Sequence, residues 1–196
     1  RTVRGVHVAG RRVVVRVAFT APLADGGVTD DSRIRAAIPT INALLQAGAS
    51  DVLASHLGRP GGKVQDGLRL RPVGERLTRL LRRNVPVTGD ALGVGTEDAV
   101  KRMRPGEVLM LENLRFHAEE EKNDPSFAAA LAPYADLFVT DAFGTAPPAN
   151  ASTVGIAKLL PASPVRMSDV GHAVSEKLQQ ATAHPFTSLP GGSKCI

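Results

Sequence analysis

The chain has 196 residues, of which 43% are hydrophobic and 22% charged, a size and composition that suit one globular domain with its own core. The single Cys195 excludes an internal disulfide, and no apolar run is long enough to span a membrane. The net charge of +5 favours anionic partners, but nucleic acid is not expected among them, because zinc-finger spacing, aromatic-studded basic strands and long basic runs are all missing.

Short apolar runs alternate with amphipathic segments along most of the chain. The runs that predict strands, the third of them weakly, are 11–17, 51–54, 85–88, 107–111 and 137–140. The segments that predict helices are 32–46, 72–83, 96–102 and 124–132, and later signals are weaker, with only a helix over 167–182 and a last strand over 186–189. This alternation predicts a Rossmann-like three-layer α/β/α fold with a mainly parallel sheet of about six strands.

Residues at the helix ends support these boundaries. Ser32 and Thr96 are expected to cap the N-termini of the first and third helices, and Asp124 is expected to begin the fourth. Gly48 suits the left-handed position that ends the first helix, in which Pro39 warns of a kink.

Loops that follow the predicted strands carry the residues of interest. In open parallel α/β sheets ligands bind beyond the carboxyl ends of the strands, so these loops should meet at one edge. Arg16, Arg59 and Arg115 belong to the segments that follow three different predicted strands. Arg33 lies at the start of the helix that follows the first of these loops. The planar fork of arginine matches carboxylate and phosphate oxygens. The sequence therefore predicts a binding site for a small anion.

Two glycines and several weaker signals belong to the same loops. Gly58 and Gly144 would let backbone N–H groups approach a bound anion closely. Taken alone, each loop arginine is more often a solvated surface residue, and His56 is more often a structural hydrogen-bonding residue than a ligand contact. The acidic run 119–121 is interpreted as a solvated charge run.

Five stretches together resemble the phosphoglycerate kinase family, over nearly the whole chain. The stretches are RRVVVRVAFTAPL (11–23), SRIRAAIPTI (32–41), SHLGRP (55–60), LENLRFHAEEE (111–121) and TDAFGTA (140–146). The resemblance implies a protein of two Rossmann-like lobes, of which residues 1–185 are the N-terminal lobe and 186–196 begin the connector to the C-terminal lobe. Hinge closure between the lobes would bring the reacting groups in line.

Carried over by position, the family's site falls on the predicted loops. Arg33 would be catalytic, because it resembles the family residue that stabilises the transferring phosphoryl group. 3-Phosphoglycerate or 1,3-bisphosphoglycerate would be bound by Arg16, Thr20, Arg33, His56, Leu57, Gly58, Arg59 and Arg115. No cofactor and no metal is expected in this chain, since Mg-ATP or Mg-ADP would bind to the missing C-terminal lobe.

The chain departs from the family pattern in two of these loops. The family's R-V-D-F-N-V-P reads R-V-A-F-T-A-P here, with Ala18 and Thr20 in place of Asp and Asn. Its G-T-A-H-R-A-H reads G-T-A-P-P-A-N, with Pro147 and Pro148 in place of a His and a substrate-binding Arg. Each lost charge-assisted contact in a buried site costs about 1.5–3 kcal/mol, so these changes predict weaker substrate binding.

Two functional hypotheses follow. The chain is either a phosphotransferase lobe that exchanges phosphoryl groups with ADP or ATP only together with the missing lobe, or a catalytically inactive relative, a pseudoenzyme with a structural role and protein partners in a larger assembly. By itself it is expected to be inactive, because it lacks the Gly-rich nucleotide loops and the acidic metal ligand of that lobe. A dinucleotide-binding protein is set aside, because the loop 18–30 has no G-x-G-x-x-G.

The expected compartment is the cytoplasm, since a single cysteine suits reducing conditions and no signal peptide is visible. Because the first residue is Arg1 and not Met, the matrix or stroma of an organelle, reached after loss of a transit peptide, is the alternative. No membrane partner is expected in either case.

Overall fold

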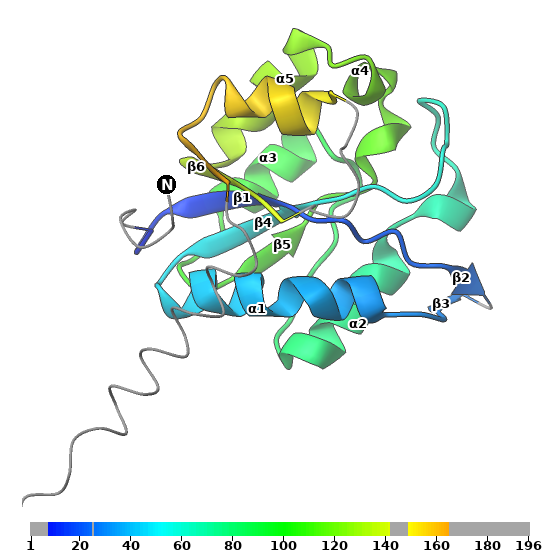
Figure 1. Cartoon of the computed structure of the whole chain (residues 1–196), viewed down its shortest axis with the longest axis horizontal. Coiled ribbons are helices and arrows are strands. Elements are labelled where there is room, and N and C mark those ends of the chain that lie inside the picture. The colour runs from blue at the N-terminus through cyan, green and yellow to red at the C-terminus, as the bar shows by residue number, and fades with distance from the viewer. Residues whose placement is uncertain (1–7, 25, 142–148, 165–196) are drawn as a thin grey trace, which may run out of the picture.

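A five-stranded parallel sheet forms the centre of the structure, a computed structural model that describes residues 8–24, 26–141 and 149–164. Its strand order is β5–β4–β1–β6–β7, so the first strand lies in the middle (Figure 1). A separate antiparallel hairpin, β2–β3, follows β1. The strands are β1 (Arg12–Arg16), β2 (Leu23–Ala24), β3 (Gly27–Val28), β4 (Ser50–Ala54), β5 (Val108–Met110), β6 (Leu137–Thr140) and β7 (Ala162–Pro164).

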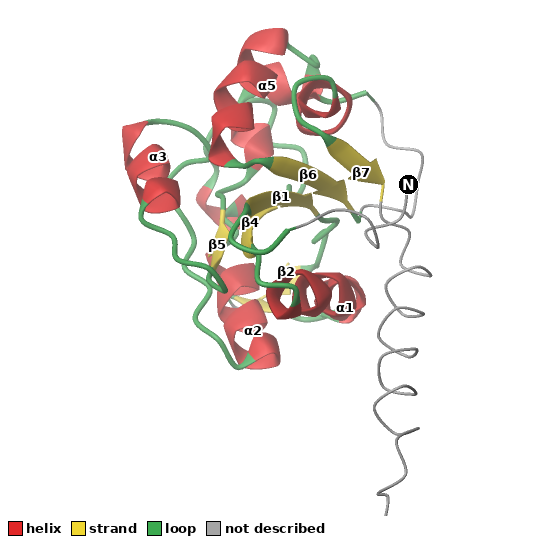
Figure 2. Ribbon diagram, turned by 90° about the vertical axis from the view of Figure 1, so that its left-hand side faces the viewer, coloured by secondary structure: helices red, strands yellow, loops and turns green. Residues whose placement is uncertain are grey.

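Helices cover both faces of the sheet and make three layers (Figure 2). The helices of one face are α1 (Ser32–Gln46) and α2 (Arg71–Leu81). The other face carries α3 (Val94–Lys101), α4 (Ala118–Glu121), α5 (Pro125–Leu131) and the π-helical turn η5 (Ala151–Gly155). Short 3₁₀ turns in the connections are η2 (Asp66–Leu68), η3 (Leu114–Phe116) and η4 (Ala132–Tyr134). The predicted three-layer α/β/α fold is confirmed, and within the described ranges no helix is long and apolar enough to cross a membrane.

The central strand shows why the strand sequences are continuously apolar. Val13 and Val15 of β1 pack in the core that contains residues of α1 and α2, whereas Val14 packs in the second core, with residues of α3 and α5. All three side chains are fully buried, so successive positions need apolar residues. β1 pairs with β4 on one side and with β6 on the other, and Val14 lies opposite Val52 and Phe138.

Prolines account for two of the errors in the strand prediction, which also missed the short β2–β3 hairpin. The segment 85–88 forms no strand, because only Val87 bridges to β5 and Pro86 has no amide hydrogen with which to extend the ladder. β7 was not predicted, because Pro161 precedes it and Pro164 is its last residue. It pairs with β6 and follows the carbonyl of Pro161, which accepts from the Phe138 amide at 3.2 Å. The sheet has five strands in the described residues, where about six were predicted. Two further predictions lie outside the described residues: the helix over 167–182 and the strand over 186–189.

The ends of α1 partly correct the prediction for that helix. Asp31 takes the position before the helix, so Ser32 is its first residue and not its cap. The helix continues through Pro39 for 15 residues, and it ends before Gly48, whose φ of +86° is the left-handed conformation that the sequence predicts.

The later helices give one correction and one confirmation. α3 begins after Gly93, so Thr96 does not cap it; the Thr96 hydroxyl donates instead to the Asp90 carbonyl at 2.7 Å. Asp124 does begin α5 as predicted, because its side chain accepts from the amide of Ser126 at 2.8 Å.

Gly74 lies where α2 packs closely on the segment that follows it. A Cβ atom at Gly74 would lie 2.3 Å from Cγ2 of Val87. We predict that Gly74→Ala lowers the free energy of unfolding by about 1–3 kcal/mol, because the stiff valine has to move. Gly95→Ala in α3, where a Cβ would meet nothing within 4 Å, should instead raise it by about 0.5–1 kcal/mol. Urea unfolding measures both changes, and equal effects would contradict the close packing of α2.

Asp51 places a carboxyl group inside the core at β4. Its side chain is fully buried, and neither carboxylate oxygen has a hydrogen-bond partner in the part of the chain that is described. Burial raises the pKa of Asp51 well above its ordinary value, and the positive charge of Arg83 opposes this only in part. The folded state therefore favours the neutral carboxyl group.

This raised pKa predicts that the protein loses stability as the pH rises. The free energy of unfolding should be highest below the unfolded-state pKa of about 4 and fall towards the folded-state pKa, by at most about 1.4 kcal/mol per pH unit. Asp51→Asn cannot ionise, so urea unfolding at pH 4.5 and pH 7 should show a smaller loss in this variant than in the wild type. Equal losses would show that Asp51 is not the group responsible.

Candidate functional site

Arg16, the last residue of β1, lies at the centre of the site. It is only 3% exposed. Its Nη2 donates to Nδ1 of His56 at 2.7 Å, its Nη1 donates to the carbonyl of Val17 at 2.6 Å, and its Nε donates to Oγ of Ser152 at 2.9 Å. Because β1 is the middle strand, its carboxyl end holds Arg16 between the loops of the neighbouring strands.

The bond from Arg16 determines the protonation of His56. A guanidinium group only donates, so Nδ1 of His56 must accept, and the imidazole is neutral with its hydrogen on Nε2. Burial, followed by the charges of Arg16 and Arg115, lowers the pKa of His56 to about 3. At neutral pH His56 is thus a hydrogen-bond donor through Nε2 and not a cation.

A buried acid offsets part of the charge of Arg16. Burial lowers the pKa of Arg16 to about 10, an effect that Glu120 opposes and Arg115 increases, so Arg16 stays charged at neutral pH. Glu120 is fully buried, whereas Glu119 and Glu121 on either side are exposed. The interpretation of this run as solvated is therefore wrong for its middle residue, which is buried and accepts hydrogen bonds from Ser152.

Arg115 reaches from η3, after β5, to the loop that follows β4. Its Nη1 donates to the carbonyl of Gly58 at 2.9 Å, and its Nε lies 3.1 Å from Oε1 of Glu121. Gly58 has a φ of +65°, and a Cβ there would lie 2.8 Å from Cδ2 of Leu68. The backbone conformation favours a glycine at this turn, whereas the half-buried end of the Leu68 side chain could shift to make room for a Cβ.

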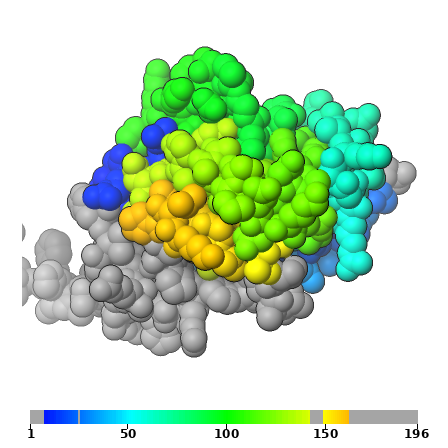
Figure 3. All heavy atoms as spheres, turned by 90° about the horizontal axis from the view of Figure 1, so that it is seen from above, coloured from blue at the N-terminus to red at the C-terminus, as the bar shows by residue number. Residues whose placement is uncertain are grey.

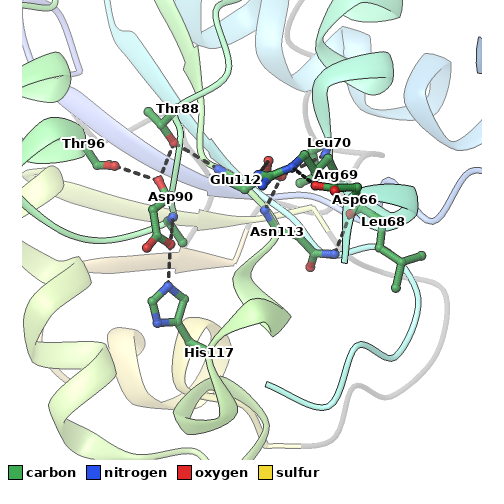
Figure 4. A network of polar contacts seen from close by, with 11 residues as sticks. Asp66, Leu68, Arg69, Leu70, Thr88, Asp90, Thr96, Glu112, Asn113 and His117 are labelled. Carbon is green, nitrogen blue, oxygen red and sulfur yellow. Dashed lines mark hydrogen bonds and ion pairs between the residues drawn. The ribbon is translucent and has the colours of Figure 1, made fainter. Parts of the chain in front are cut away.

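Asn113 also joins these two loops, and Figure 4 shows its side chain bonded to Leu68. Its Nδ2 donates to the carbonyls of Leu57 at 2.8 Å and Leu68 at 2.9 Å. Its Oδ1 accepts from the amides of Leu57 at 3.3 Å and Arg115 at 3.1 Å. One buried amide side chain thereby sets the backbone on which both Arg115 and the 55–60 loop depend.

Glu112, which precedes Asn113, extends this network (Figure 4). Its carboxylate accepts from the amide of Leu70 at 2.8 Å and from Nη1 of Arg69 at 3.3 Å. At the other end, Nε2 of His117 lies 2.6 Å from Oδ1 of Asp90. The segment after β5 is thus tied to both segments that flank α2.

Ser55 holds the loop that follows β1. Its hydroxyl donates to the carbonyl of Val17 at 3.0 Å and accepts from the amide of Phe19 at 3.1 Å. Ala18 lies between these two residues, half-buried, with a methyl group where the family pattern has a carboxylate. Thr20, also half-buried, follows in the same loop.

The structure joins five of the proposed residues in two hydrogen-bonded groups and leaves three apart. Arg16 bonds to His56, and Arg115 bonds to Gly58 and shares the side chain of Asn113 with Leu57. Arg33 and Arg59 are exposed, and no hydrogen bond or ion pair joins them or Thr20 to these five within the described ranges. Gly144, Pro147 and Pro148 lie outside those ranges.

Five buried polar residues of the site were missed by the sequence analysis. They are Ser55, Glu112, Asn113, Glu120 and Ser152. Asn113 stands inside the LENLRFH stretch, which is the one signal that could have drawn attention to it. Ser152 lies 136 positions from Arg16 in the chain, and no local sequence pattern predicts a contact over that separation.

We predict that Asn113→Ala lowers the free energy of unfolding by about 2–4 kcal/mol, because it leaves buried backbone groups of the 55–60 loop unpaired. Urea unfolding measures the change. Asn84→Ala, at an exposed position, is the matched control and should change stability by less than about 0.5 kcal/mol. Similar values for the two variants would contradict the role given to Asn113.

Curated relatives support the resemblance seen in the five sequence stretches. The sequence model of the family described as phosphoglycerate kinase matches residues 3–196. The phosphoglycerate kinase of Desulforudis audaxviator is 50% identical over 195 residues, which are 99% of this chain and 50% of the relative. That of Moorella thermoacetica is 49% identical over 193 residues, 98% of this chain and 49% of the relative.

Solved structures agree with the sequence comparison. The phosphoglycerate kinase of Coxiella burnetii matches with a TM-score of 0.75 and 31% identity, over 95% of this chain and 46% of that one. The enzyme of Pyrococcus horikoshii matches with a TM-score of 0.77 and 28% identity, over 96% of this chain and 47% of that one. The chain spans about half the length of the relatives it matches. It belongs to the phosphoglycerate kinase family, of which it represents the N-terminal region.

Proposed function

We propose that this chain is the substrate-binding half of a phosphoglycerate kinase and that it binds 3-phosphoglycerate or 1,3-bisphosphoglycerate at the carboxyl edge of its sheet. One observation carries the proposal. Arg16, His56 and Arg115 follow three different strands and meet at that edge, with Arg16 bonded to His56 at 2.7 Å and both arginine charges acting on the imidazole.

Each of these groups suits an anionic ligand. Arg16 and Arg115 supply positive charge close to the edge, and a guanidinium group matches the planar oxygens of a carboxylate or a phosphate. His56 adds an uncharged donor through Nε2. Because that nitrogen carries the hydrogen at neutral pH, His56 would bind a ligand oxygen without needing to be protonated first.

Arg33 is the residue that we assign to catalysis. It is exposed in the first turn of α1, which begins at the same edge of the sheet, so its guanidinium group is accessible to a bound substrate (Figure 1). Its role would be to stabilise the charge on the transferring phosphoryl group. The exposed Arg59 and the half-buried Thr20 would complete the binding surface.

Phosphoryl transfer to or from ADP or ATP requires a second lobe in this proposal. The relatives are about twice as long as the matched region, which leaves room for such a lobe in them. Mg-ATP or Mg-ADP would bind there, outside these 196 residues, and closure of the two lobes would exclude water and align the reacting groups. The 196 residues alone would bind substrate without turning it over.

A second candidate function rests on Ala18. At this half-buried position the family pattern has an acidic residue that orients the substrate, and a methyl group cannot replace its hydrogen bonds. This change favours a catalytically inactive relative with a structural role and protein partners in a larger assembly. The two candidates differ in whether the chain binds 3-phosphoglycerate.

Isothermal titration with 3-phosphoglycerate at low ionic strength tests the proposal. We predict that the chain binds this ligand and that Arg33→Ala/Arg59→Ala weakens binding at least about tenfold, because two charged donors are removed. The matched control is Arg79→Ala/Arg102→Ala, which makes the same change in net charge at exposed positions of α2 and after α3. It should keep the wild-type affinity within about twofold.

Two results would overturn the substrate site. One is the absence of heat at millimolar ligand in a chain shown to be folded by circular dichroism. The other is equal weakening by the two double variants, which would mean that the ligand responds to net charge and not to this edge. Either result would favour the structural role.

A further inference from the structure

A buried chain of hydrogen bonds leads from α4 to the candidate site. Both oxygens of Glu120 accept from Ser152, one from its amide at 2.8 Å and one from its hydroxyl at 2.5 Å. The same hydroxyl accepts from Nε of Arg16 at 2.9 Å, and Arg16 donates onward to His56 at 2.7 Å. Glu120 and Ser152 have no measurable exposure.

The chain can run in only one direction. A serine hydroxyl has one hydrogen, and Glu120, which as a carboxylate can only accept, takes it. The lone pairs of Ser152 Oγ are therefore left for Arg16 Nε, and Arg16, which can only donate, leaves Nδ1 of His56 to accept. The guanidinium group itself makes Nδ1 of His56 the acceptor, so Glu120 and Ser152 can act on the imidazole only by holding Arg16 in place.

The same contacts join two segments of the fold. α4 and η5 pack against each other, and in Figure 3 the yellow-to-orange segment that contains η5 lies against the green segment that contains α4 and α5. A purely structural role for Glu120, as an anchor of η5, would require the bond to the Ser152 amide and nothing more. The second bond, to the hydroxyl, adds a connection to Arg16 that such an anchor does not need.

We propose that Glu120 and Ser152 are positioning residues that hold Arg16 against His56 and so keep His56 in the tautomer that carries its hydrogen on Nε2. Neither residue touches the substrate in this proposal. That a bound anion uses this Nε2–H rests on the function proposed above, whereas the tautomer itself does not depend on any ligand.

Long-range ¹H–¹⁵N spectra of the histidine rings at pH 7 test the proposal in the wild-type chain without ligand. The nitrogen shifts distinguish the two neutral tautomers and the imidazolium. His56→Gln identifies the signals of His56 among those of the five histidines. A single Nε2–H tautomer is expected, and an Nδ1–H tautomer or an imidazolium would overturn the proposal.

Two variants then separate positioning from anchoring. Ser152→Ala removes the hydroxyl but keeps the amide that bonds to Glu120, and Glu120→Gln keeps the shape but not the charge. In each, His56 should become a mixture of tautomers. Glu119→Gln, an exposed neighbour, is the control and should keep the wild-type spectrum. A single Nε2–H tautomer in folded Ser152→Ala would overturn the proposal, and if Glu120→Gln fails to fold, Ser152→Ala decides alone.

Calorimetry with 3-phosphoglycerate completes the test. Ser152→Ala should weaken binding about tenfold while Glu119→Gln leaves it unchanged, because only the first variant disturbs the donor of His56. Unchanged binding in Ser152→Ala together with mixed tautomers would overturn the link between the tautomer and the ligand. If the wild type binds no 3-phosphoglycerate, the proposed function fails, but the spectra still decide whether Glu120 and Ser152 position Arg16.

Discussion

The charge of Arg16, buried at the carboxyl end of the central strand, constrains the rest of the site. A buried charge without partners costs several kcal/mol, so the nitrogens of its guanidinium group need acceptors. The acceptors are Val17, Ser152 and His56, which lie directly after β1, in η5 and in the loop after β4. The order of the strands, with β1 between β4 and β6, brings these parts of the chain to one place.

This constraint decides what the site can offer a ligand. His56 is kept neutral, so the positive charge at the edge belongs to arginines and does not vary near neutral pH. In the described part of the chain Glu120 is the acidic residue that counters the charge of Arg16. The loop after β1 has Ala18, which carries no negative charge, where the family pattern has an acidic residue. The loops themselves are held by Ser55 and Asn113, whose side chains bond to backbone groups and not to the arginines.

Much of the fold could be predicted because local patterns carry it. β1, β4 and β6 are short apolar runs, and α5 has its capping Asp124 in the sequence. The prediction failed where prolines give a local signal that tertiary pairing overrides, as in β7. The convergence of Arg16, His56 and Arg115 could be predicted because loops at the carboxyl ends of parallel strands meet at one edge of the sheet. The burial of Glu120 could not, because three consecutive glutamates do not reveal which one is buried. The contact between Arg16 and Ser152 spans 136 positions, so no local pattern predicts it.

The most direct test of the anion site follows the side chains themselves. The ¹H–¹⁵N signals of His56 Nε2–H and of the Nε–H groups of Arg16 and Arg115 can be recorded while 3-phosphoglycerate is added. These signals should shift together and reach saturation with one dissociation constant, while those of the distant Arg79 stay in place. Shifts confined to surface arginines such as Arg79, or no shift at millimolar ligand, would contradict a site centred on Arg16.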